Sequence, residues 1–377
     1  MIDEPRAKRH QSVSKPPRLL SRVRIRNFRC FEDLRIDALA HVNLVGGRNN
    51  AGKTALLEAL FLLAGCHTTQ LPTRLNQLRG YITELNNPRE VWGWLFRDKD
   101  VSRTIRIEGD GKSIGKIELD INLVVGTGRQ ESASSGNLGQ RKADHARKDQ
   151  DSNAGLAEML TYRVRRNGKE LFGGTTALAQ DHVKYATADR MIFPLCAFLT
   201  TRGSDGVTDA KIFSQLQETG ADEAIIAPLQ ALEPRLRRVV TAVVDGVPML
   251  RADLGGDRLV PIAFLGEGVV KLVSILLHIR LAAGGIVLVD EVESGFHHSV
   301  LESVWTAIRS AAVLGRTQVV ATTHSLEMLR AAHRVFDGDS REECSYMRLE
   351  RSGDAVKVVH YTPEALAAAI SGGLEVR

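Results

Sequence analysis

Cysteine, aromatic side chains and long apolar runs are all scarce in this sequence of 377 residues. The four cysteines, Cys30, Cys66, Cys196 and Cys344, lie far apart and form no CxxC pair, so their spacing indicates neither a zinc site nor a disulfide framework. Aromatic residues make up 5% of the chain, and no stripe combines them with basic residues, which argues against a base-stacking platform for single-stranded nucleic acid. No apolar run approaches the roughly 20 residues of a membrane span, and the charged N-terminus lacks the apolar core of an export signal. We therefore expect a cytoplasmic protein with no membrane partner.

Positive charge is in modest excess, with a formal net charge of +5 and a pI near 9.1. Much of the excess lies in the first thirty residues, where nine basic side chains cluster: Arg6, Lys8, Arg9, Lys15, Arg18, Arg22, Arg24, Arg26 and Arg29. Such a cluster either contacts phosphates or is a solvated arm, and charge runs are usually solvated. Residues 1–19 have no apolar periodicity, and we interpret them as a flexible basic arm.

A complete phosphate-binding motif occupies residues 47–54 (GRNNAGKT), which fit GxxxxGK[ST] without a mismatch. A strand is predicted at 41–45 and a buried helix at 55–64, and this setting favours nucleotide binding over a chance glycine-rich turn. Backbone N–H groups and the helix N-terminus would hold phosphate oxygens, Lys53 would neutralise the β- and γ-phosphates as a catalytic residue, and the Thr54 hydroxyl would bind Mg²⁺. We expect ATP to contact Gly47, Asn49, Asn50, Gly52, Lys53 and Thr54.

A second element is an apolar strand at 285–289 that ends in two carboxylates, Asp290 and Glu291. In a phosphate-loop enzyme the first carboxylate accepts Mg²⁺-bound water and the second polarises the attacking water. We therefore predict Asp290 as the Mg²⁺ residue and Glu291 as the general base. In isolation the pair would be interpreted as two surface acids, and the phosphate loop upstream favours the catalytic role.

A third element is a strand at 318–323 that is followed by His324 and Ser325. An imidazole here can donate a hydrogen bond to the γ-phosphate and sense its presence. A lone histidine is usually structural, but this position, after a strand beyond the Asp-Glu pair, favours a catalytic role for His324.

These three elements, in this order, resemble the ATP-binding-cassette-like (ABC-like) ATPases, the class that includes RecF, the SMC proteins and the ATPase half of the overcoming-lysogenization-defect (OLD) nucleases. The match runs from Arg22 to the C-terminus. Residues 23–31 (VRIRNFRCF), 290–298 (DEVESGFHH) and 323–325 (THS) resemble in particular the compact prokaryotic AAA-family ATPases similar to OLD. The resemblance implies an α/β fold of the ABC-type P-loop NTPase head, with a mixed sheet, an antiparallel β layer and a helical subdomain.

The resemblance also implies an ATP-dependent head-to-head homodimer, in which a signature loop of one subunit completes the phosphate site of the other. The matching residues are 264–268 (FLGEG), at the start of a helix predicted at 269–281, so Gly266, Glu267 and Gly268 are candidate nucleotide contacts. Gly266 stands where transporters and SMC proteins have serine, so a hydroxyl contact to the γ-phosphate is missing and slow turnover is expected. Without the resemblance this loop is only a turn before a helix.

Composition and periodicity divide the chain into four parts. After the arm 1–19, residues 20–202 form an N-terminal ATPase lobe, with antiparallel strands predicted at 103–125 and 161–166. Its segment 126–153 has almost no large apolar side chains and is interpreted as a mobile insertion. Residues 203–250 are predicted as a helical subdomain, because apolar residues recur at helical spacing over 205–245. Residues 251–377 form a C-terminal ATPase lobe with the signature-like loop, the Asp-Glu pair and the histidine.

Some residues keep two interpretations. The class places a glutamine between the phosphate loop and the signature, and Gln180, Gln215 and Gln217 all remain open for that role. Residues 27–29 (NFR) contact the nucleotide or pack in the core. His297 and His298, at a helix start, are helix caps or contacts to a partner subunit, and caps are commoner.

Two segments that the sequence lacks narrow the function further. No heptad run is long enough for the coiled coil of an SMC protein, and the segment after Ser325 leaves no room for a TOPRIM nuclease domain of on the order of 100 residues. We expect an ATPase with ATP and Mg²⁺ as cofactors that dimerises on ATP and regulates a separately encoded effector, a nuclease or toxin, in prokaryotic anti-phage defence. The alternatives are a RecF-like DNA repair ATPase that binds duplex DNA, and a nucleotide-binding scaffold without turnover.

Overall fold

The computed structural model describes residues 18–81, 87–127, 156–179, 182–184, 194–201 and 204–376. The predicted arm 1–19 lies outside the described residues up to position 17, and the predicted insertion 126–153 lies outside them from position 128 onwards. Gln180, one of the three candidate glutamines, also lies outside them.

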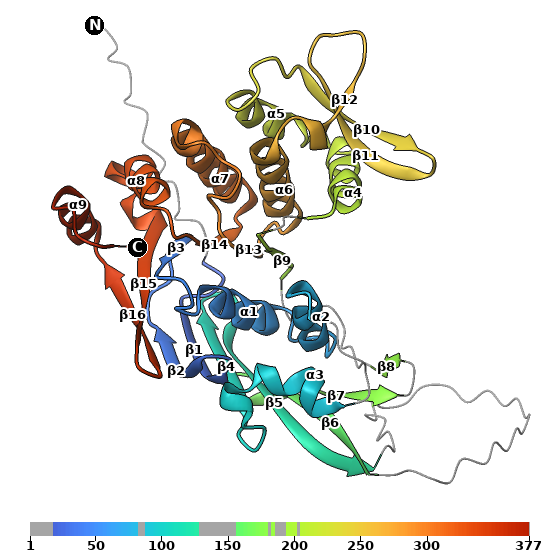
Figure 1. Ribbon diagram of the computed structural model, residues 1–377, viewed down its shortest axis with the longest axis vertical. Coiled ribbons are helices and arrows are strands. Elements are labelled where there is room, and N and C mark those ends of the chain that lie inside the picture. The colour runs from blue at the N-terminus through green and yellow to red at the C-terminus, as the bar shows by residue number, and fades with distance from the viewer. Residues whose placement is uncertain are drawn as a thin grey trace, which may run out of the picture.

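An antiparallel sheet forms one layer of the protein, as the alternating pattern predicts (Figure 1). Its order is β2-β1-β4-β5-β6-β7-β8. The strands are β1 (Arg22–Phe28), β2 (Phe31–Ile36), β4 (Ile105–Gly111), β5 (Gly115–Thr127), β6 (Leu156–Arg166), β7 (Lys169–Ala179) and β8 (His182–Lys184). Side chains alternate between its two faces, so one face contributes Ile25, Ile107 and Leu119 to the core and the other carries charges.

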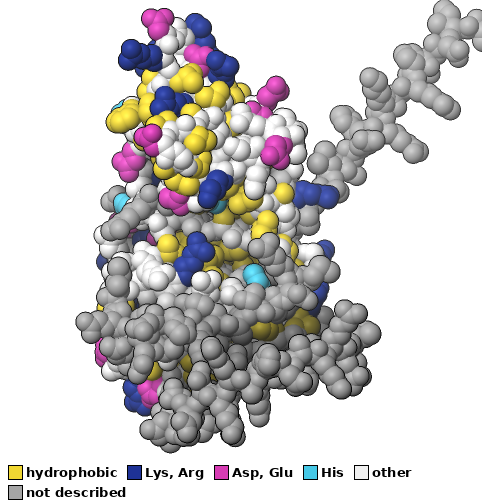
Figure 2. Space-filling model, turned by 90° about the vertical axis from the view of Figure 1, so that its right-hand side faces the viewer, with side chains coloured by type: hydrophobic (Ala, Val, Ile, Leu, Met, Phe, Trp, Pro, Cys, Tyr) yellow, Lys and Arg dark blue, Asp and Glu magenta, His cyan; other side chains and the backbone are white. Residues whose placement is uncertain are grey.

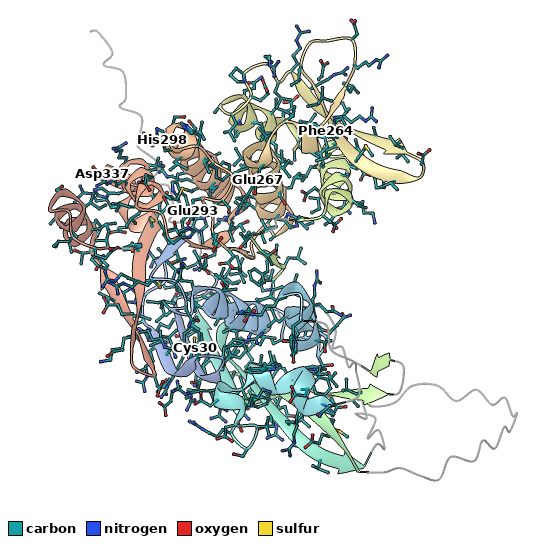
Figure 3. The ribbon with its side chains drawn as sticks, viewed as in Figure 1. Cys30, Phe264, Glu267, Glu293, His298 and Asp337 are labelled. Atoms are coloured by element: carbon teal, nitrogen blue, oxygen red, sulfur yellow. The ribbon has the colours of Figure 1, made fainter. Side chains whose placement is uncertain are left out.

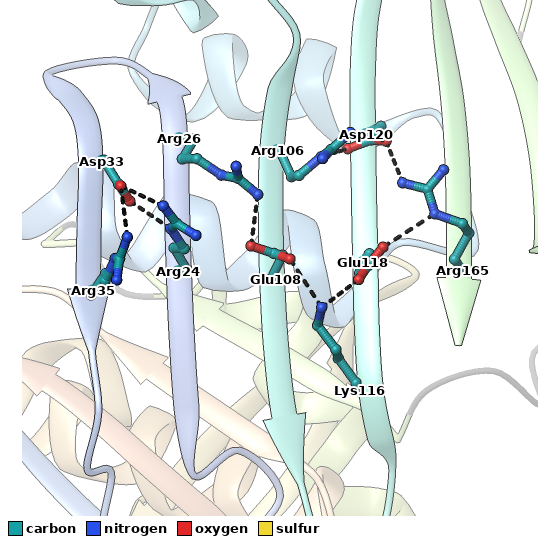
Figure 4. Close-up of polar contacts among 10 residues, drawn as sticks. All are labelled: Arg24, Arg26, Asp33, Arg35, Arg106, Glu108, Lys116, Glu118, Asp120 and Arg165. Carbon is teal, nitrogen blue, oxygen red and sulfur yellow. Dashed lines mark hydrogen bonds and ion pairs between the residues drawn. The ribbon is translucent and has the colours of Figure 1, made fainter. Parts of the chain in front are cut away.

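The charged face of this sheet is a ladder of ion pairs that runs across five strands (Figure 4). Arg24 contacts Asp33, and Arg26 contacts Glu108. Lys116 links Glu108 to Glu118, and the ladder continues through Arg165 and Arg106 to Asp120. Arginines of the N-terminal cluster are therefore paired with carboxylates of the same sheet.

A second, mostly parallel sheet has the order β16-β15-β3-β14-β13-β9. Its strands are β3 (Val42–Gly46), β9 (Cys196–Leu199), β13 (Ile286–Val289), β14 (Gln318–Thr322), β15 (Cys344–Ser352) and β16 (Ala355–Tyr361), and only β16 is antiparallel to its neighbour. The central strands β3, β13 and β14 are buried along their whole length. On β13, Ile286 and Leu288 enter one hydrophobic core while Val287 and Val289 enter a second, as expected for a parallel sheet covered on both faces.

Helices cover both faces of the parallel sheet (Figure 1). On one side α1 (Lys53–Ala64) packs between the two sheets, followed by α2 (Leu71–Leu78) and α3 (Pro88–Trp92); nearly every residue of α1 is buried, which explains its apolar composition. The other side carries α4 (Gly206–Gln217), α5 (Glu223–Gln230), α6 (Glu267–Leu281), α7 (Leu301–Gly315) and α8 (Leu326–Val335), with α9 (Pro363–Ser371) against α8.

The prediction of helix over 205–245 is correct for α4 and α5 and wrong beyond them. Residues 238–253 form a hairpin of β10 (Arg238–Val244) and β11 (Val247–Asp253), with β12 (Val260–Pro261) added to it. The turn is Asp245-Gly246, and both residues have positive φ, which favours an Asp-Gly hairpin. The β-branched run in β10 satisfies a helical period and an alternating one, and the turn decides between them. Residues 203–250 are therefore not a purely helical subdomain, and the predicted boundary at 250 falls inside β11.

The fold class is confirmed as mixed α/β, with the phosphate loop between β3 and α1 and an additional antiparallel layer. The parallel sheet takes β3 and β9 from the predicted N-terminal lobe and β13 to β16 from the C-terminal lobe, so both lobes share one core. Within the described ranges, each helix is too short or too polar to span a bilayer.

Candidate functional site

The predicted phosphate loop follows the carboxyl end of β3 and opens α1. Its first glycine, Gly47, has φ of 139°, and a Cβ there would lie 2.6 Å from the carbonyl oxygen of Leu349 on β15. Only glycine fits such a backbone beside a neighbouring strand. The local sequence therefore folds the loop tightly over the sheet edge, where ligands of parallel α/β sheets bind.

The N-terminus of α1 can bind an anion. Gly52 is the N-cap residue, no side chain caps the helix, and the first turn contains no acidic residue. The first N–H groups of a helix have no partner within it and carry partial positive charge. Lys53 adds a full charge; its Nζ donates to the carbonyl oxygens of Gly47 at 2.6 Å and Arg48 at 3.1 Å, so it curls over the loop. Burial lowers the pKa of Lys53, and the carboxylate of Asp290 acts in the opposite direction.

The candidate Mg²⁺ residues are joined by a direct hydrogen bond. The Thr54 hydroxyl donates to Asp290 Oδ2 at 2.8 Å, although 236 positions separate them in the chain. Asp290 is buried, and its other oxygen accepts a hydrogen bond from the Thr322 hydroxyl at 2.5 Å. Hydroxyl and carboxylate oxygens are ligands that Mg²⁺ prefers. Thr54 and Asp290 therefore fit the metal that the sequence predicts, and Thr322 orients the carboxylate.

Glu291, the predicted general base, lies at the end of β13 in an unusual backbone conformation. Its φ is +45°, a left-handed region that a residue with a Cβ enters at a cost of about 1 kcal/mol or more. Its N–H donates to the Thr322 hydroxyl at 2.8 Å. Such strained residues cluster at functional sites, because the surrounding structure must hold them in place.

An open cleft of about 990 Å³ lies beside the phosphate loop. It is lined by Arg29, Cys30, Asn49, Asn50, Gly52, Lys53, Thr54, Ala55, Arg79, Trp94, Phe96, Asp98, Lys99, Asp290, Glu291 and Arg351. The structure thus brings together most of the residues predicted to contact ATP with both carboxylates.

Two arginines of this cleft are held by one buried carboxylate. Glu58, one turn after Thr54 on α1, accepts hydrogen bonds from Arg79 Nε at 2.5 Å and from Arg29 Nε at 3.1 Å. Two guanidinium groups share one carboxylate, so Arg29, Arg79 and Glu58 together keep a net positive charge beside the phosphate cleft. A second feature is the rim, where Lys99 Nζ lies 3.9 Å from the ring centroid of Trp94, whose side chain is 49% exposed. Neither feature was found from the sequence, except for the 27–29 run that contains Arg29.

The role predicted for a glutamine is not filled by the described candidates. Gln215 and Gln217 are exposed on α4, and neither lines the cleft. Thr200 and Thr201, which follow β9, instead line a smaller pocket together with Thr54 and Asp290. The signal in the sequence was a short apolar strand followed by two polar residues, at the carboxyl edge where β3 and β13 also end.

His324 follows β14, as predicted, but is not among the residues that line the phosphate cleft. Its Nδ1 lies 2.9 Å from Glu293 Oε1, and its backbone N–H donates to the same oxygen at 2.8 Å. Glu293 therefore fixes this histidine. Contact of His324 with a γ-phosphate remains a prediction.

The signature-like loop lies away from the phosphate cleft of its own chain. Phe264 and Glu267 are on the helical side of the protein, and Cys30 at the rim of the cleft is on the other (Figure 3). Gly266 is the N-cap residue of α6 and has φ of 104°. A serine, which other signature loops have at this position, would be strained in this backbone conformation. Phe264 is 80% exposed. Gly266, Glu267 and Gly268 therefore do not contact the phosphate loop within one chain.

The interpretation of His297 as a cap is confirmed. Its ring Nδ1 accepts from the N–H of Ser299, and its ring lies at a tilt of 43° to that of His298, with centroids 4.1 Å apart. Both precede α7, which begins at Leu301.

The match to a known family decides the identity of the chain. Residues 42–330 match the family described as "AAA domain, putative AbiEii toxin, Type IV TA system". The chain belongs to this AAA family. The match covers the phosphate loop, the signature-like loop, the Asp-Glu pair and His324, so it includes every predicted site residue of this AAA protein.

Two curated proteins are similar in sequence to the AAA protein. An ATP/GTP phosphatase of Helicobacter pylori is 22% identical over 349 residues, which cover 84% of this chain and 88% of that protein. The DNA replication and repair protein RecF of Thioalkalivibrio sulfidiphilus is 31% identical over 134 residues, or 33% of this chain and 37% of RecF. The family assignment of the chain rests on the AAA match, which covers most of its length.

Solved SMC heads have a distant likeness to the AAA protein. An SMC head bound to the C-terminal winged-helix domain of ScpA has a TM-score of 0.48 and 10% identity, covering 92% of this chain and 98% of that one. The SMC head domain of Thermotoga maritima has a TM-score of 0.43 and 11% identity, with 91% and 98% covered. The fold class follows from the strand order of the chain and does not depend on these likenesses.

Proposed function

We propose that this protein hydrolyses ATP to ADP and phosphate in a Mg²⁺-dependent reaction, and that ATP joins two copies of it into a homodimer. The observation that carries the proposal is the hydrogen bond between Thr54 and Asp290, which joins the phosphate loop to the Asp-Glu pair. Mg²⁺ bound at these oxygens would neutralise charge on the phosphates. Lys53 and the α1 N-terminus bind the phosphates, and Glu291 accepts the proton of the attacking water as the bond to ADP breaks.

A phosphate-release assay of Glu291→Gln tests the hydrolysis. We expect turnover to fall by about 10²–10⁴-fold, as for loss of a general base, while ATP still binds. The matched control is Glu170→Gln, since Glu170 is exposed on β7 of the charged sheet face. Unchanged phosphate release in Glu291→Gln would remove Glu291 as the base, and ATP binding without any release in the wild type would favour the scaffold without turnover.

The dimer is supported by the separation of the signature-like loop from the phosphate cleft of its own chain. A helix N-terminus and an exposed Phe264 are suited to a partner surface, and no described residue of 264–268 lines the chain's own cleft. We propose that this loop closes the nucleotide site of a second copy.

We further propose that the ATP-bound dimer regulates a separately encoded effector, a nuclease or toxin, in prokaryotic defence against phage, as in OLD-like systems. The family description names a putative toxin of a type IV toxin–antitoxin system, and the two-component nature of such a system supports a separately encoded functional partner. Affinity purification from native cells tests it. Co-purification of one nuclease or toxin with the wild type in an ATP-dependent manner is expected, and consistent recovery of the protein alone would contradict it.

A second candidate function is a RecF-like ATPase that binds duplex DNA, which the partial match to RecF favours. Arg24 and Arg26 are ion-paired with carboxylates of the same sheet, which neutralises these two members of the basic cluster and counts against DNA binding there. On the face shown in Figure 2, basic and acidic side chains are interspersed with hydrophobic ones. Binding that weakens steeply with salt, with ATPase stimulation by duplex DNA, would establish this function; equal rates with and without DNA would exclude it.

A further inference from the structure

A lysine on the signature-like helix α6 is buried in the protein interior. Lys271 is 5% exposed, although lysine is almost never fully buried unless it is paired. It lies one turn into α6, behind the signature-like loop. Burial lowers the pKa of Lys271, and the carboxylates of Glu293 and Glu291 oppose that shift. Neither the sequence motifs nor the proposed reaction assigns this residue a role.

The hydrogen bonds of Lys271 go to the main chain of the Asp-Glu pair. Its Nζ donates to the carbonyl oxygen of Glu291 at 2.6 Å and to that of Asp290 at 3.4 Å. In the part of the chain that the structure describes, no ion pair of Lys271 with a carboxylate is present. The ammonium group of Lys271 therefore donates to two backbone carbonyls, those of the proposed Mg²⁺ residue and of the proposed base.

These hydrogen bonds complete the restraint on a strained residue. Glu291 has φ of +45°, and its N–H donates to the Thr322 hydroxyl on β14. Its carbonyl oxygen accepts from Lys271 on α6. The peptide groups on both sides of Glu291 are thus held by side chains of two different elements, which is what a backbone outside its preferred regions requires.

We propose that Lys271 is a positioning residue for ATP hydrolysis, which holds the left-handed backbone of Glu291 and so directs its carboxylate into the phosphate cleft. The proposal rests on the proposed function of Glu291 as the base. Lys271 itself touches neither the cleft nor a reacting atom.

Close packing at the start of α6 gives the contact a second consequence. A Cβ at Gly268 would lie 2.6 Å from the carbonyl oxygen of Gly295, so the first turn of α6 packs directly on the loop that follows Glu291. A shift of α6 is therefore transmitted to that loop. If the signature-like loop meets the nucleotide of a second copy, Lys271 connects that event to the base of its own chain.

Stability alone does not explain why a lysine is buried at position 271. A buried charge is expensive to desolvate, and ion pairs in protein interiors are often replaced by apolar side chains without loss of stability. A core residue selected for stability would not be a lysine bonded only to carbonyls. Lys271→Met removes the desolvated charge but leaves the two carbonyl oxygens without that donor, so the two effects oppose each other and the melting temperature should change little while the backbone of Glu291 is released.

The test compares Lys271→Met with Lys211→Met, a matched control on the exposed face of α4. Turnover of ATP by Lys271→Met should fall by about 10–100-fold with the KM for ATP within about twofold of the wild type, because a mispositioned base affects the chemical step and not binding. Amide exchange of residues 290–295 should accelerate about tenfold, as expected for loss of one hydrogen bond to a strained segment. The control should change neither quantity.

The exchange measurement separates this inference from the proposed function. Suppose that the wild type hydrolyses no ATP but Lys271→Met still accelerates amide exchange at 290–295. Lys271 would then hold the backbone of Glu291, and the proposed hydrolysis would be rejected. Unchanged kcat and unchanged exchange in folded Lys271→Met would overturn the inference. So would a loss of activity that only follows a lower melting temperature, since Lys271 would then be a structural core residue.

Discussion

Two helices of this protein begin at glycine-containing loops, and their surroundings differ. The loop before α1 contacts other parts of its own chain: Lys53 is buried against the loop carbonyls, and Thr54 is hydrogen-bonded to Asp290, which follows β13. The loop before α6 faces outwards, with Phe264 80% exposed and no heavy atom within 4 Å of a Cβ built on Gly266. One loop already has its catalytic partners within the chain, and the other presents a free helix N-terminus.

This difference indicates that the two loops have different roles in phosphate binding. An anion site is strong where backbone N–H groups and a lysine converge, and α1 has both. The N-terminus of α6 has the N–H groups, but its first turn carries the acidic Glu267 and no lysine. We propose that it contacts a phosphate only where a second molecule supplies the rest of the site. We propose that the two loops are two halves of one composite site, which Lys271 connects within each chain.

The largest expected effect is a loss of ATP affinity when the phosphate loop is changed. Lys53→Ala should weaken ATP binding and abolish phosphate release, with a loss of at least about 100-fold, because it removes the charge-assisted contacts to the phosphates. Lys169→Ala, on the exposed end of β7, is the control. Titration with a fluorescent ATP analogue measures the change. ATP affinity that survives Lys53→Ala would mean that this cleft does not hold the phosphates.

The next effect concerns the outward loop. Phe264→Asp should weaken ATP-dependent dimerisation at least about tenfold, because an exposed aromatic side chain at an interface is replaced by a charge. ATP affinity of the monomer should stay within about twofold. Sedimentation velocity with and without ATP measures the dimer, and Val243→Asp on the similarly exposed β10–β11 hairpin is the matched control. An equal effect of both substitutions would show that the loop has no special place in the dimer.

The smallest effect lies in the charged sheet face, which serves as a reference away from both loops. Hydrogen bonding from Arg24 lowers the pKa of Asp33 to about 2. The resulting stability is present in full above the unfolded-state pKa of about 4 and is lost as the pH falls towards 2. Asp33 is partly exposed, so the contribution stays below about 1 kcal/mol. Asp33→Asn should therefore lower the melting temperature slightly at pH 7 and not at pH 2, with phosphate release unchanged. A larger effect on phosphate release than on stability would place this face in the mechanism.

The parts of the site that form contiguous motifs were predictable from the sequence. Residues 47–54 are one loop, and Asp290 and Glu291 end one strand, so local pattern is enough to place their roles. Thr322, Thr200 and the Glu58–Arg79 pair are set by long-range packing of β14, β9 and α1, and isolated threonine and glutamate residues carry no signal of that packing.

The fold shows the same limit. The buried strand at 286–289 and the helix that begins near 267 were predicted because an apolar run and a helical period are each unambiguous there. The β10–β11 hairpin was mistaken for helix because its β-branched residues satisfy both periods, and only the positive φ of Asp245 and Gly246 separates them. The burial of Lys271 could not be predicted either, because a lysine in an amphipathic helix is normally solvated.

The most direct test of the composite site mixes two inactive variants. Lys53→Ala disables the phosphate loop. Gly266→Asp introduces a carboxylate that repels a phosphate and a Cβ that strains the backbone at φ of 104°, so it disables the signature-like loop. In a mixed dimer, the intact phosphate loop of one chain faces the intact signature-like loop of the other. Equal amounts should therefore recover about a quarter of the wild-type rate of phosphate release, since half of the dimers are mixed and each holds one complete site. A rate equal to the sum of the two separate variants would contradict the composite site.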